Sequence, residues 1–289
     1  SYSEDAHLNA YPWEQCVKIL NPLSSDLGVM RQTLLFGGLE SIRRNINRKA
    51  ANLKFFEVGN TYKYEKEKWS EENPIKAYQQ EYHLALWITG KRVQGSWAHA
   101  DEESSFYELK ANVENILRRI GIAQNALTTE ASDNNIFDKA LALKTRGGKT
   151  IVEMGILSHK LLKKMDIAQT VFYADIHWTN LMKAIRKNKL QFQELSKYPS
   201  VSRDLALLLD SNIEFAQIEE IARQTEKKLL KKVELFDVYE GKNLPEGKKS
   251  YAVNFILQDE TKTLNDKAID AIMQKLIKNI TTKLGAELR

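Results

Sequence analysis

The chain contains a single cysteine, Cys16, among its 289 residues, and it lacks long apolar runs. One cysteine excludes a disulfide within the chain and suits a reducing compartment, so we expect a cytoplasmic protein. No run of about 18 apolar residues occurs, which argues against a membrane-spanning helix and against a membrane partner. Residues 1–10 are polar and acidic, do not begin with Met and lack the apolar core of a signal peptide. We therefore expect a piece of a longer protein.

Motifs that carry catalysis are also absent. No P-loop, no GxGxxG fingerprint and no GxSxG nucleophile elbow occurs. The five histidines stand at no metal-ligand spacing from one another or from Cys16, so we expect no metal site. The segment Gly147-Gly148-Lys149 lies between two expected strands, where a hairpin turn explains it better than a phosphate-binding loop. The sequence therefore predicts no catalytic residue and no bound cofactor.

The chain also has only a small excess of charge of one sign. The chain has 43 lysines and arginines against 38 aspartates and glutamates, and its net charge of +5 attracts a polyanionic partner only weakly. Its 43% apolar and 28% charged residues are ordinary for globular chains and exclude disordered and collagen-like classes. At roughly 150 residues per domain, the length predicts two domains. We place them at 1–196 and 197–289. A helix-like stretch over 179–187 gives way to a polar run, and Tyr198-Pro199 then favours entry into a strand, so the boundary is expected near Ser196.

The C-terminal part has the more regular pattern. Alternating apolar residues predict strands over 201–210, 233–239 and 251–257, with a short last strand over 286–289. A capping box at Ser211 and Glu214 opens a helix with an apolar stripe that reaches Leu229. Thr263 caps a longer helix, which Gly285 ends. This βαββαβ order is ferredoxin-like, with two helices on one face of the sheet and the other face open.

The N-terminal part mixes helices and strands less regularly. Apolar stripes predict helices around residues 35–46 and 109–120 and from residue 179. Strands are expected over residues 53–58, 82–88, 151–157 and 171–178. Because strands and helices do not alternate as in a parallel sheet, an antiparallel sheet flanked by helices is expected. The predicted fold class is therefore α+β for the whole chain.

Basic residues gather in two clusters. One comprises Arg43, Arg44, Arg48, Lys49 and Lys54, and the other comprises Lys227, Lys228, Lys231 and Lys232. A solvated helix end with favourable dipole charge explains such clusters in most cases. Contact with an acidic protein surface or with an RNA backbone is the alternative, and both explanations stay open for each cluster.

A sharper pattern lies on two of the C-terminal strands. Alternation places Asp237 and Tyr239 on one face of their strand. On the next strand, Ser250 and Ala252 alternate with large apolar residues and so belong to the open face. An aromatic ring beside small polar residues on an open sheet is typical of proteins that stack and hydrogen-bond unpaired RNA bases. The plainer alternative is that Tyr239 packs on the following loop and Asp237 caps a turn.

Several strings together resemble one known family. In the C-terminal part these are Tyr198-Pro-Ser-Val-Ser-Arg-Asp-Leu-Ala, Leu235-Phe-Asp-Val-Tyr-Glu-Gly and Leu244-Pro-Glu-Gly-Lys-Lys-Ser. They are similar to the ferredoxin-fold anticodon-binding domain that ends the β subunit of bacterial phenylalanine–tRNA ligases. Asn21-Pro-Leu-Ser and Phe55-Phe-Glu-Val-Gly resemble the catalytic-like module of the same subunit. The resemblance covers nearly the whole chain.

The resemblance implies a division of labour between subunits. In this family the α subunit charges tRNA(Phe) with phenylalanine at the expense of ATP, within a heterotetramer of two α and two β subunits. The β module keeps a class II synthetase-like antiparallel sheet without the active site. Here Phe55 stands two residues before Glu57 in place of an arginine, and no GxGxG run occurs. We therefore expect a non-catalytic module that docks the α subunit, with ATP and Mg²⁺ bound outside this chain.

The resemblance also implies roles for individual residues. Tyr239 would stack on an anticodon base and Asp237 would accept hydrogen bonds from base edges, while Ser250 and Ala252 would let the nucleotide approach. Contacts to phosphates or to the α subunit are expected from Arg203, Lys227, Lys228, Lys231, Arg43, Arg44 and Arg48. For Arg203, an ion pair with Asp204 or Asp210 is an equally good explanation. The alternatives to the whole hypothesis are a protein-interaction scaffold that binds no RNA and a residually active class II ligase.

Overall fold

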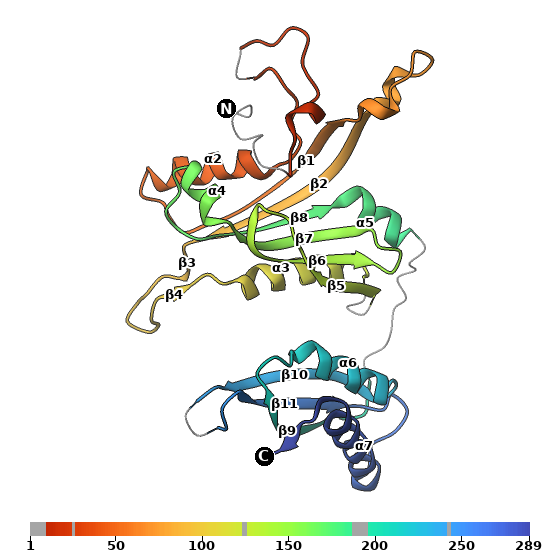
Figure 1. Ribbon diagram of the computed structural model, residues 1–289. Helices are drawn as coiled ribbons and strands as arrows, with labels where there is room; N and C mark the ends of the chain where they lie inside the picture. The colour runs from red at the N-terminus through yellow and green to blue at the C-terminus, as the bar shows by residue number, and fades with distance from the viewer. Residues whose placement is uncertain (1–9, 25–26, 123–125, 187–195, 242–243) are drawn as a thin grey trace. The chain divides into compact units, whose positions relative to one another are not determined.

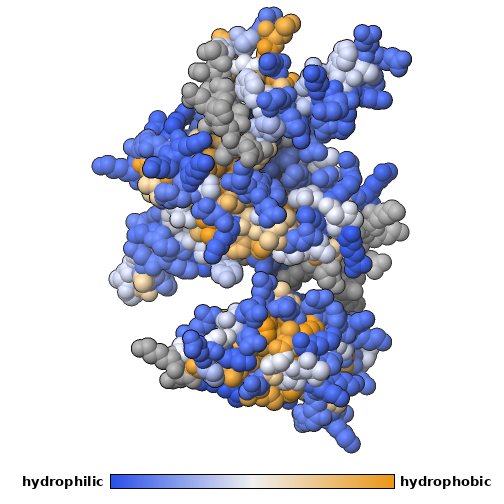
Figure 2. Space-filling model, in the orientation of Figure 1, coloured by the Kyte–Doolittle hydropathy of each residue, from blue (hydrophilic) through white to orange (hydrophobic). Residues whose placement is uncertain are grey.

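The computed structural model describes residues 10–24, 27–122, 126–186, 196–241 and 244–289 (Figure 1). They belong to two compact units, within Ser1–Leu190 and Gln191–Arg289. The boundary predicted near Ser196 adjoins residues 187–195, which lie outside the described part, and it stays a prediction. In the described part of the chain, every helix is too short or too polar to cross a membrane. Apolar side chains reach the surface of both units among mainly hydrophilic ones (Figure 2).

The first unit is built on a six-stranded sheet in the order β1-β2-β8-β7-β6-β5, and every neighbouring pair is antiparallel. The strands are β1 (Leu53–Tyr64), β2 (Tyr78–Thr89), β5 (Leu127–Ala131), β6 (Phe137–Thr145), β7 (Thr150–Leu157) and β8 (Val171–His177). A separate ribbon pairs β3 (Lys91–Val93) with β4 (Glu102–Glu103). Short 3₁₀ helices are η1 (Trp13–Gln15), η3 (Lys66–Lys68) and η4 (Pro74–Ala77). The predicted α+β class with an antiparallel sheet is confirmed.

Helices cover both faces of this sheet (Figure 1). They are α2 (Leu35–Ile46), α3 (Phe106–Arg119), α4 (His159–Lys164) and α5 (Trp178–Ile185). Successive residues of a strand point to opposite faces, so Trp87 and Tyr173 pack under α2 and α4, whereas Ile88 and Phe172 pack under α3 and α5. On α2, a Cβ on Gly38 would lie 2.2 Å from Cε2 of Trp87, so this glycine permits the close approach of helix and sheet.

Some turns and strands of the first unit agree with the sequence-based predictions, and others were missed. The hairpin expected at Gly148 joins β6 and β7, with its N–H donating to the Thr145 carbonyl at 2.8 Å and a φ of +76°. The expected strands over 53–58 and 82–88 extend to twelve residues each. Strand β5 and helix α4 were not predicted, and β6 was expected only as the strand before the Gly147-Gly148 turn, without bounds. Most of the exposed positions of β5 are polar, so its apolar alternation is weak.

The second unit has the element order β9 (Val201–Asp210), α6 (Phe215–Thr225), β10 (Leu230–Tyr239), β11 (Lys248–Leu257), α7 (Asp266–Leu284) and β12 (Glu287–Leu288). The sheet runs β10-β11-β9-β12, with all neighbours antiparallel. The predicted ferredoxin-like βαββαβ arrangement is therefore confirmed. Its core lies between the sheet and the two helices, where Leu207, Val253 and Phe255 meet Ile218 and Leu276.

The ends of these helices differ in part from the prediction. The capping box of α6 is formed by Glu214 and Gln217, so Ser211 is not the cap, and the helix ends before Leu229. Helix α7 is capped by Asn265, whose side-chain oxygen accepts from the N–H of Ala268 at 2.9 Å, and not by Thr263. The polar stretch before each helix contains several side chains that could accept from the same free N–H groups at the start of the helix. The sequence pattern alone therefore does not fix which residue is the N-cap. Gly285 ends α7 with a φ of +63°, as predicted.

Candidate nucleic-acid interface

The open face of the second unit's sheet brings the four predicted anticodon residues together. In the β10–β11 pair, Asp237 lies opposite Ala252 and Tyr239 lies opposite Ser250. Residues directly opposite in an antiparallel pair share a face and lie within contact range. The intervening residues of β11, Tyr251 and Val253, are buried in the core. The four residues therefore lie on the face that α6 and α7 do not cover.

A β-bulge in β10 is responsible for this orientation. Leu235 lies opposite Val253, but the next paired residue of β10 is Asp237, opposite Ala252, so Phe236 is the additional residue. Strict alternation would place Asp237 on the same face as Leu235, which packs against the core. The additional residue reverses the alternation, as bulges do. Asp237 and Tyr239 therefore lie on the open face because of the bulge, which the prediction from simple alternation did not include.

The side chain of Tyr239 has both a packed and an exposed part. A Cβ on Gly241 would lie 2.5 Å from its hydroxyl and from Cζ, so the ring rests on the backbone of the following loop. The guanidinium carbon of Arg289 lies 5.7 Å from the ring centroid, within cation–π range. Tyr239 nevertheless keeps 37% of its surface exposed. The loop contact of the plainer explanation is therefore present, and a free area for stacking is present as well.

Small and polar side chains continue across the sheet from Tyr239. Ser250 is buried and Ala252 is partly exposed, and both side chains are small, so they project little above β11. Further along the strand, the side-chain amide of Asn254 donates to Ser202 and Asp204 of β9. The face thus offers the aromatic ring of Tyr239, carboxylate acceptors and an amide, which are the groups that bind bases by stacking and by their edges.

Arg203 lies on the other side of the sheet from these residues. It is opposite Phe255 of the core, whereas its neighbour on β9, Asp204, is opposite Asn254. Its guanidinium lies 3.8 Å from the Asp266 carboxylate at the start of α7. The alternative explanation, an ion pair with Asp204 or Asp210, is therefore wrong in its partner, which is Asp266. Because the sheet separates it from Tyr239, Arg203 is not part of the open face.

The predicted basic clusters are also separated from Tyr239. Lys227 and Lys228 are exposed just before β10, and Lys231 forms an ion pair with Glu260 at 2.7 Å. Tyr239 ends the same strand, and a strand of that length spans roughly 30 Å. These lysines could reach phosphates only of nucleotides well away from a base stacked on Tyr239.

In the first unit, the cluster at the end of α2 is exposed. Arg43, Arg44 and Arg48 all project from the last turn of the helix or the loop after it, where positive charge is favourable. Lys54 forms an ion pair with Glu108 of α3. This surface is available to a partner, but it belongs to a different unit from the open sheet face.

Among the residues that the structure describes near Tyr239, Arg289 was not predicted as part of the site. It closes the string Leu284-Gly-Ala-Glu-Leu-Arg, which also resembles the family's last segment, but nothing local relates it to Tyr239. Its N–H donates to the carbonyl of Ala206 at 3.1 Å, which holds the end of the chain beside β9. Only this pairing of the last strand brings its charge to the ring.

Comparisons with known proteins agree on both units. Residues 1–178 match the family described as "Phenylalanyl tRNA synthetase beta chain CLM domain", and residues 196–289 match "Ferredoxin-fold anticodon binding domain". The chain is 57% identical to a phenylalanine–tRNA ligase β subunit of Bacteroides fragilis, over 98% of this chain and 34% of that protein. It is 49% identical to the corresponding protein of Porphyromonas gingivalis over the same shares. The chain thus spans about a third of the length of these curated relatives.

The solved structure of a pyrrolysyl-tRNA synthetase from Desulfitobacterium hafniense aligns with this chain at 12% sequence identity and a TM-score of 0.42. The alignment covers 62% of this chain and 59% of the synthetase chain. A likeness this slight assigns no function.

Proposed function

Because the chain belongs to the phenylalanyl-tRNA synthetase β-chain family, we propose that it is the part of a β subunit that binds the anticodon of tRNA(Phe) and docks the catalytic α subunit. The family resemblance predicted from the sequence motifs is confirmed by both matches. The RNA-binding half rests on one observation, the grouping of Tyr239, Asp237, Ser250 and Ala252 on the uncovered face of the second unit.

Recognition by this face follows from its chemistry. The exposed part of the Tyr239 ring would stack on an unpaired base, and the Asp237 carboxylate would accept hydrogen bonds from exocyclic amino groups. The low side chains of Ser250 and Ala252 would leave room for the nucleotide above β11. Arg289 would move from the ring to a neighbouring phosphate, exchanging a weak cation–π contact for a charge-assisted one.

A competition experiment tests anticodon recognition. A short stem-loop with the tRNA(Phe) anticodon should displace tRNA(Phe) from the full chain, because base edges and stacking carry the specificity. The same stem-loop with a changed anticodon is the control and should compete at least about tenfold less well, the equivalent of roughly 1.4 kcal/mol. Equal competition by both would leave only charge-driven binding. No binding of either would favour the protein-interaction scaffold.

The first unit is proposed to be a non-catalytic docking module. The Glu57 carboxylate is ion-paired with Arg31, and Phe55 stands two residues before it, so this segment offers no free arginine to a nucleotide. ATP and Mg²⁺ would be bound elsewhere in a cytoplasmic enzyme with two α and two β subunits. Pyrophosphate exchange with phenylalanine by this chain alone would instead support the residually active ligase.

An apolar groove of about 590 Å³ between β1, β2 and α3 is our candidate for the α-subunit contact. Phe56, Leu86, Ile88 and Ile116 line it, with Arg119 at its side. Phe56 is 74% exposed although it is a large apolar residue on an edge strand. Apolar surface on an open edge typically marks a protein contact.

Replacing Phe56 with glutamate should therefore weaken co-purification with the α subunit by about tenfold, because a charge would have to be desolvated at the contact. Its exposure predicts a change in the free energy of unfolding of no more than about 0.5 kcal/mol. Trp97→Glu is the matched control, since Trp97 is fully exposed near the β3–β4 ribbon, outside the groove. Equal retention of the α subunit by both variants would exclude the groove.

A further inference from the structure

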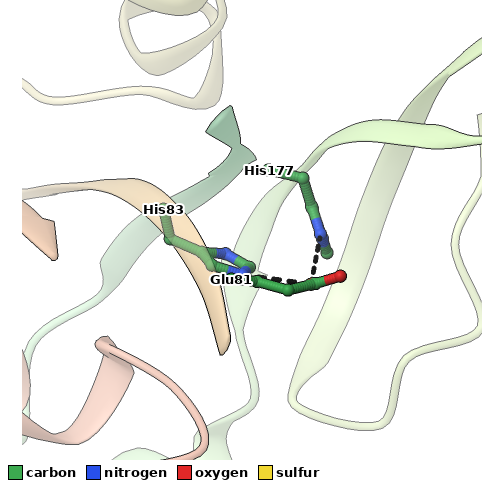
Figure 3. Close-up of side chains that lie close together, drawn as sticks. All are labelled: Glu81, His83 and His177. Atoms are coloured by element: carbon green, nitrogen blue, oxygen red, sulfur yellow. Dashed lines mark ion pairs between the residues drawn. The ribbon is translucent and has the colours of Figure 1, made fainter. Parts of the chain in front are cut away.

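Two histidines and a glutamate from β2 and β8 meet on the face of the first unit's sheet (Figure 3). The register places His83 directly opposite His177, and Glu81 lies two residues before His83 on the same face. The two imidazole rings are 4.6 Å apart between centroids and tilted by 53°. In Figure 3 the Glu81 side chain extends toward both rings.

The distances suit shared coordination of one ion. The Glu81 Oε2 atom lies 3.5 Å from His83 Nε2 and 3.9 Å from His177 Nδ1. One ligand atom from each of the three residues lies within 4.8 Å of the others. Zinc bonds of about 2.0–2.2 Å at tetrahedral angles separate neighbouring ligand atoms by roughly 3.3–3.5 Å. Small side-chain rotations would close the remaining difference.

A fourth residue, Asp175, orients His83. Its carboxylate lies 2.7 Å from His83 Nδ1, which leaves Nε2 directed toward Glu81. A carboxylate behind a histidine is the usual second partner of a metal-bound imidazole, because it fixes the tautomer and raises the basicity of the ligand. The negative charges of Asp175 and Glu81 beside His83 would also stabilise a bound dication.

We propose that Glu81, His83 and His177 form a binding site for a transition-metal dication of the Zn²⁺ type, with Asp175 as the residue that positions His83. Two histidines and one glutamate are an established donor set for zinc, with a further position left to water or another ligand. His83 is buried, whereas Glu81 and His177 keep 44% and 24% of their side chains exposed, so the ion could enter from solvent. Bound there, it would link β2 to β8.

This site differs from the expectation that the chain holds no metal. The two histidines are far apart in the sequence, so no ligand spacing could show them. Strand register alone makes them neighbours. The site lies in the first unit, so its test does not depend on RNA binding by the second unit.

The test is a calorimetric titration of the metal-free full chain with Zn²⁺. One equivalent per chain should bind. His177→Gln should raise the dissociation constant for Zn²⁺ by more than about 100-fold, and Asp175→Asn should raise it by about 10- to 100-fold. His177 is the better ligand to replace, because it is partly exposed and its side chain makes no capping hydrogen bond with α5. His159→Gln, at an exposed histidine on α4, is the matched control and should bind as the original chain does.

Cobalt provides a second measurement. Co²⁺ should give the intense visible absorption of a four-coordinate site in the original chain and in His159→Gln, but not in His177→Gln. Thermal unfolding without metal checks that each variant is folded. Unchanged Zn²⁺ affinity in folded His177→Gln, loss of binding in Cys16→Ser, or no stoichiometric binding to the folded original chain would each overturn the proposal. The cluster would then be an ion-pair network only.

Discussion

Replacing Tyr239 with alanine is expected to weaken the binding of tRNA(Phe) by about 1–3 kcal/mol, the usual contribution of one base stacked on an aromatic ring. The ring lies opposite the small Ser250, so its direct neighbour on β11 could not replace its stacking. The measurement is a titration at one fixed salt concentration, because phosphate contacts make affinity strongly salt-dependent.

Two further variants serve as controls for the effect of Tyr239→Ala on tRNA(Phe) binding. Tyr239→Phe keeps the ring and should retain most of the affinity. Gln274→Ala changes an exposed residue of α7, the helix that covers the opposite face of the sheet, and should leave the affinity unchanged. Because Tyr239 also contacts Gly241, thermal unfolding of each variant must show an intact second unit. An unchanged affinity in folded Tyr239→Ala would remove this residue from the interface.

The second large effect is expected from Phe255→Ala, which should lower the free energy of unfolding of the second unit by about 3–5 kcal/mol. Phe255 is completely buried between the sheet and its two helices, so truncation leaves a cavity as well as lost apolar contact. Domains are stable by only about 5–15 kcal/mol in total. The loss is therefore a large share of the stability of this unit, and scanning calorimetry measures it.

Phe236→Ala is the matched control for stability, since Phe236 is the bulge residue on the neighbouring strand and is 59% exposed. Truncating it should change the free energy of unfolding by no more than about 0.5 kcal/mol, as at most surface positions. Equal losses from the two phenylalanines would contradict both the burial of Phe255 and the outward position of the bulge.

Charge contributes less to the proposed interface than the whole chain suggests. Residues 197–289 contain 16 lysines and arginines and 15 aspartates and glutamates. A nearly neutral unit gains little from general attraction to phosphates, so stacking and base-edge contacts must carry its specificity. The separation of Lys227 and Lys228 from Tyr239 along β10 agrees with this division.

The sequence alone determined the features that depend on neighbours along the chain. The strand over 201–210 has the predicted bounds, the helix over 35–46 follows its apolar stripe, and Gly285 ends the last helix. Alternation, helical periodicity and left-handed glycine ends are local properties, so they can be inferred from consecutive residues. The ferredoxin-like order followed from them, because it is a succession of such elements.

Only the tertiary structure decided which residues face one another. The additional residue Phe236 turns Asp237 and Tyr239 to the open face, the last strand brings Arg289 to the tyrosine ring, and the β2–β8 register joins His83 to His177. Each of these depends on hydrogen bonds between segments that are distant in the sequence. Since a shift of one residue in such pairing moves a side chain to the other face of the sheet, local pattern cannot fix it.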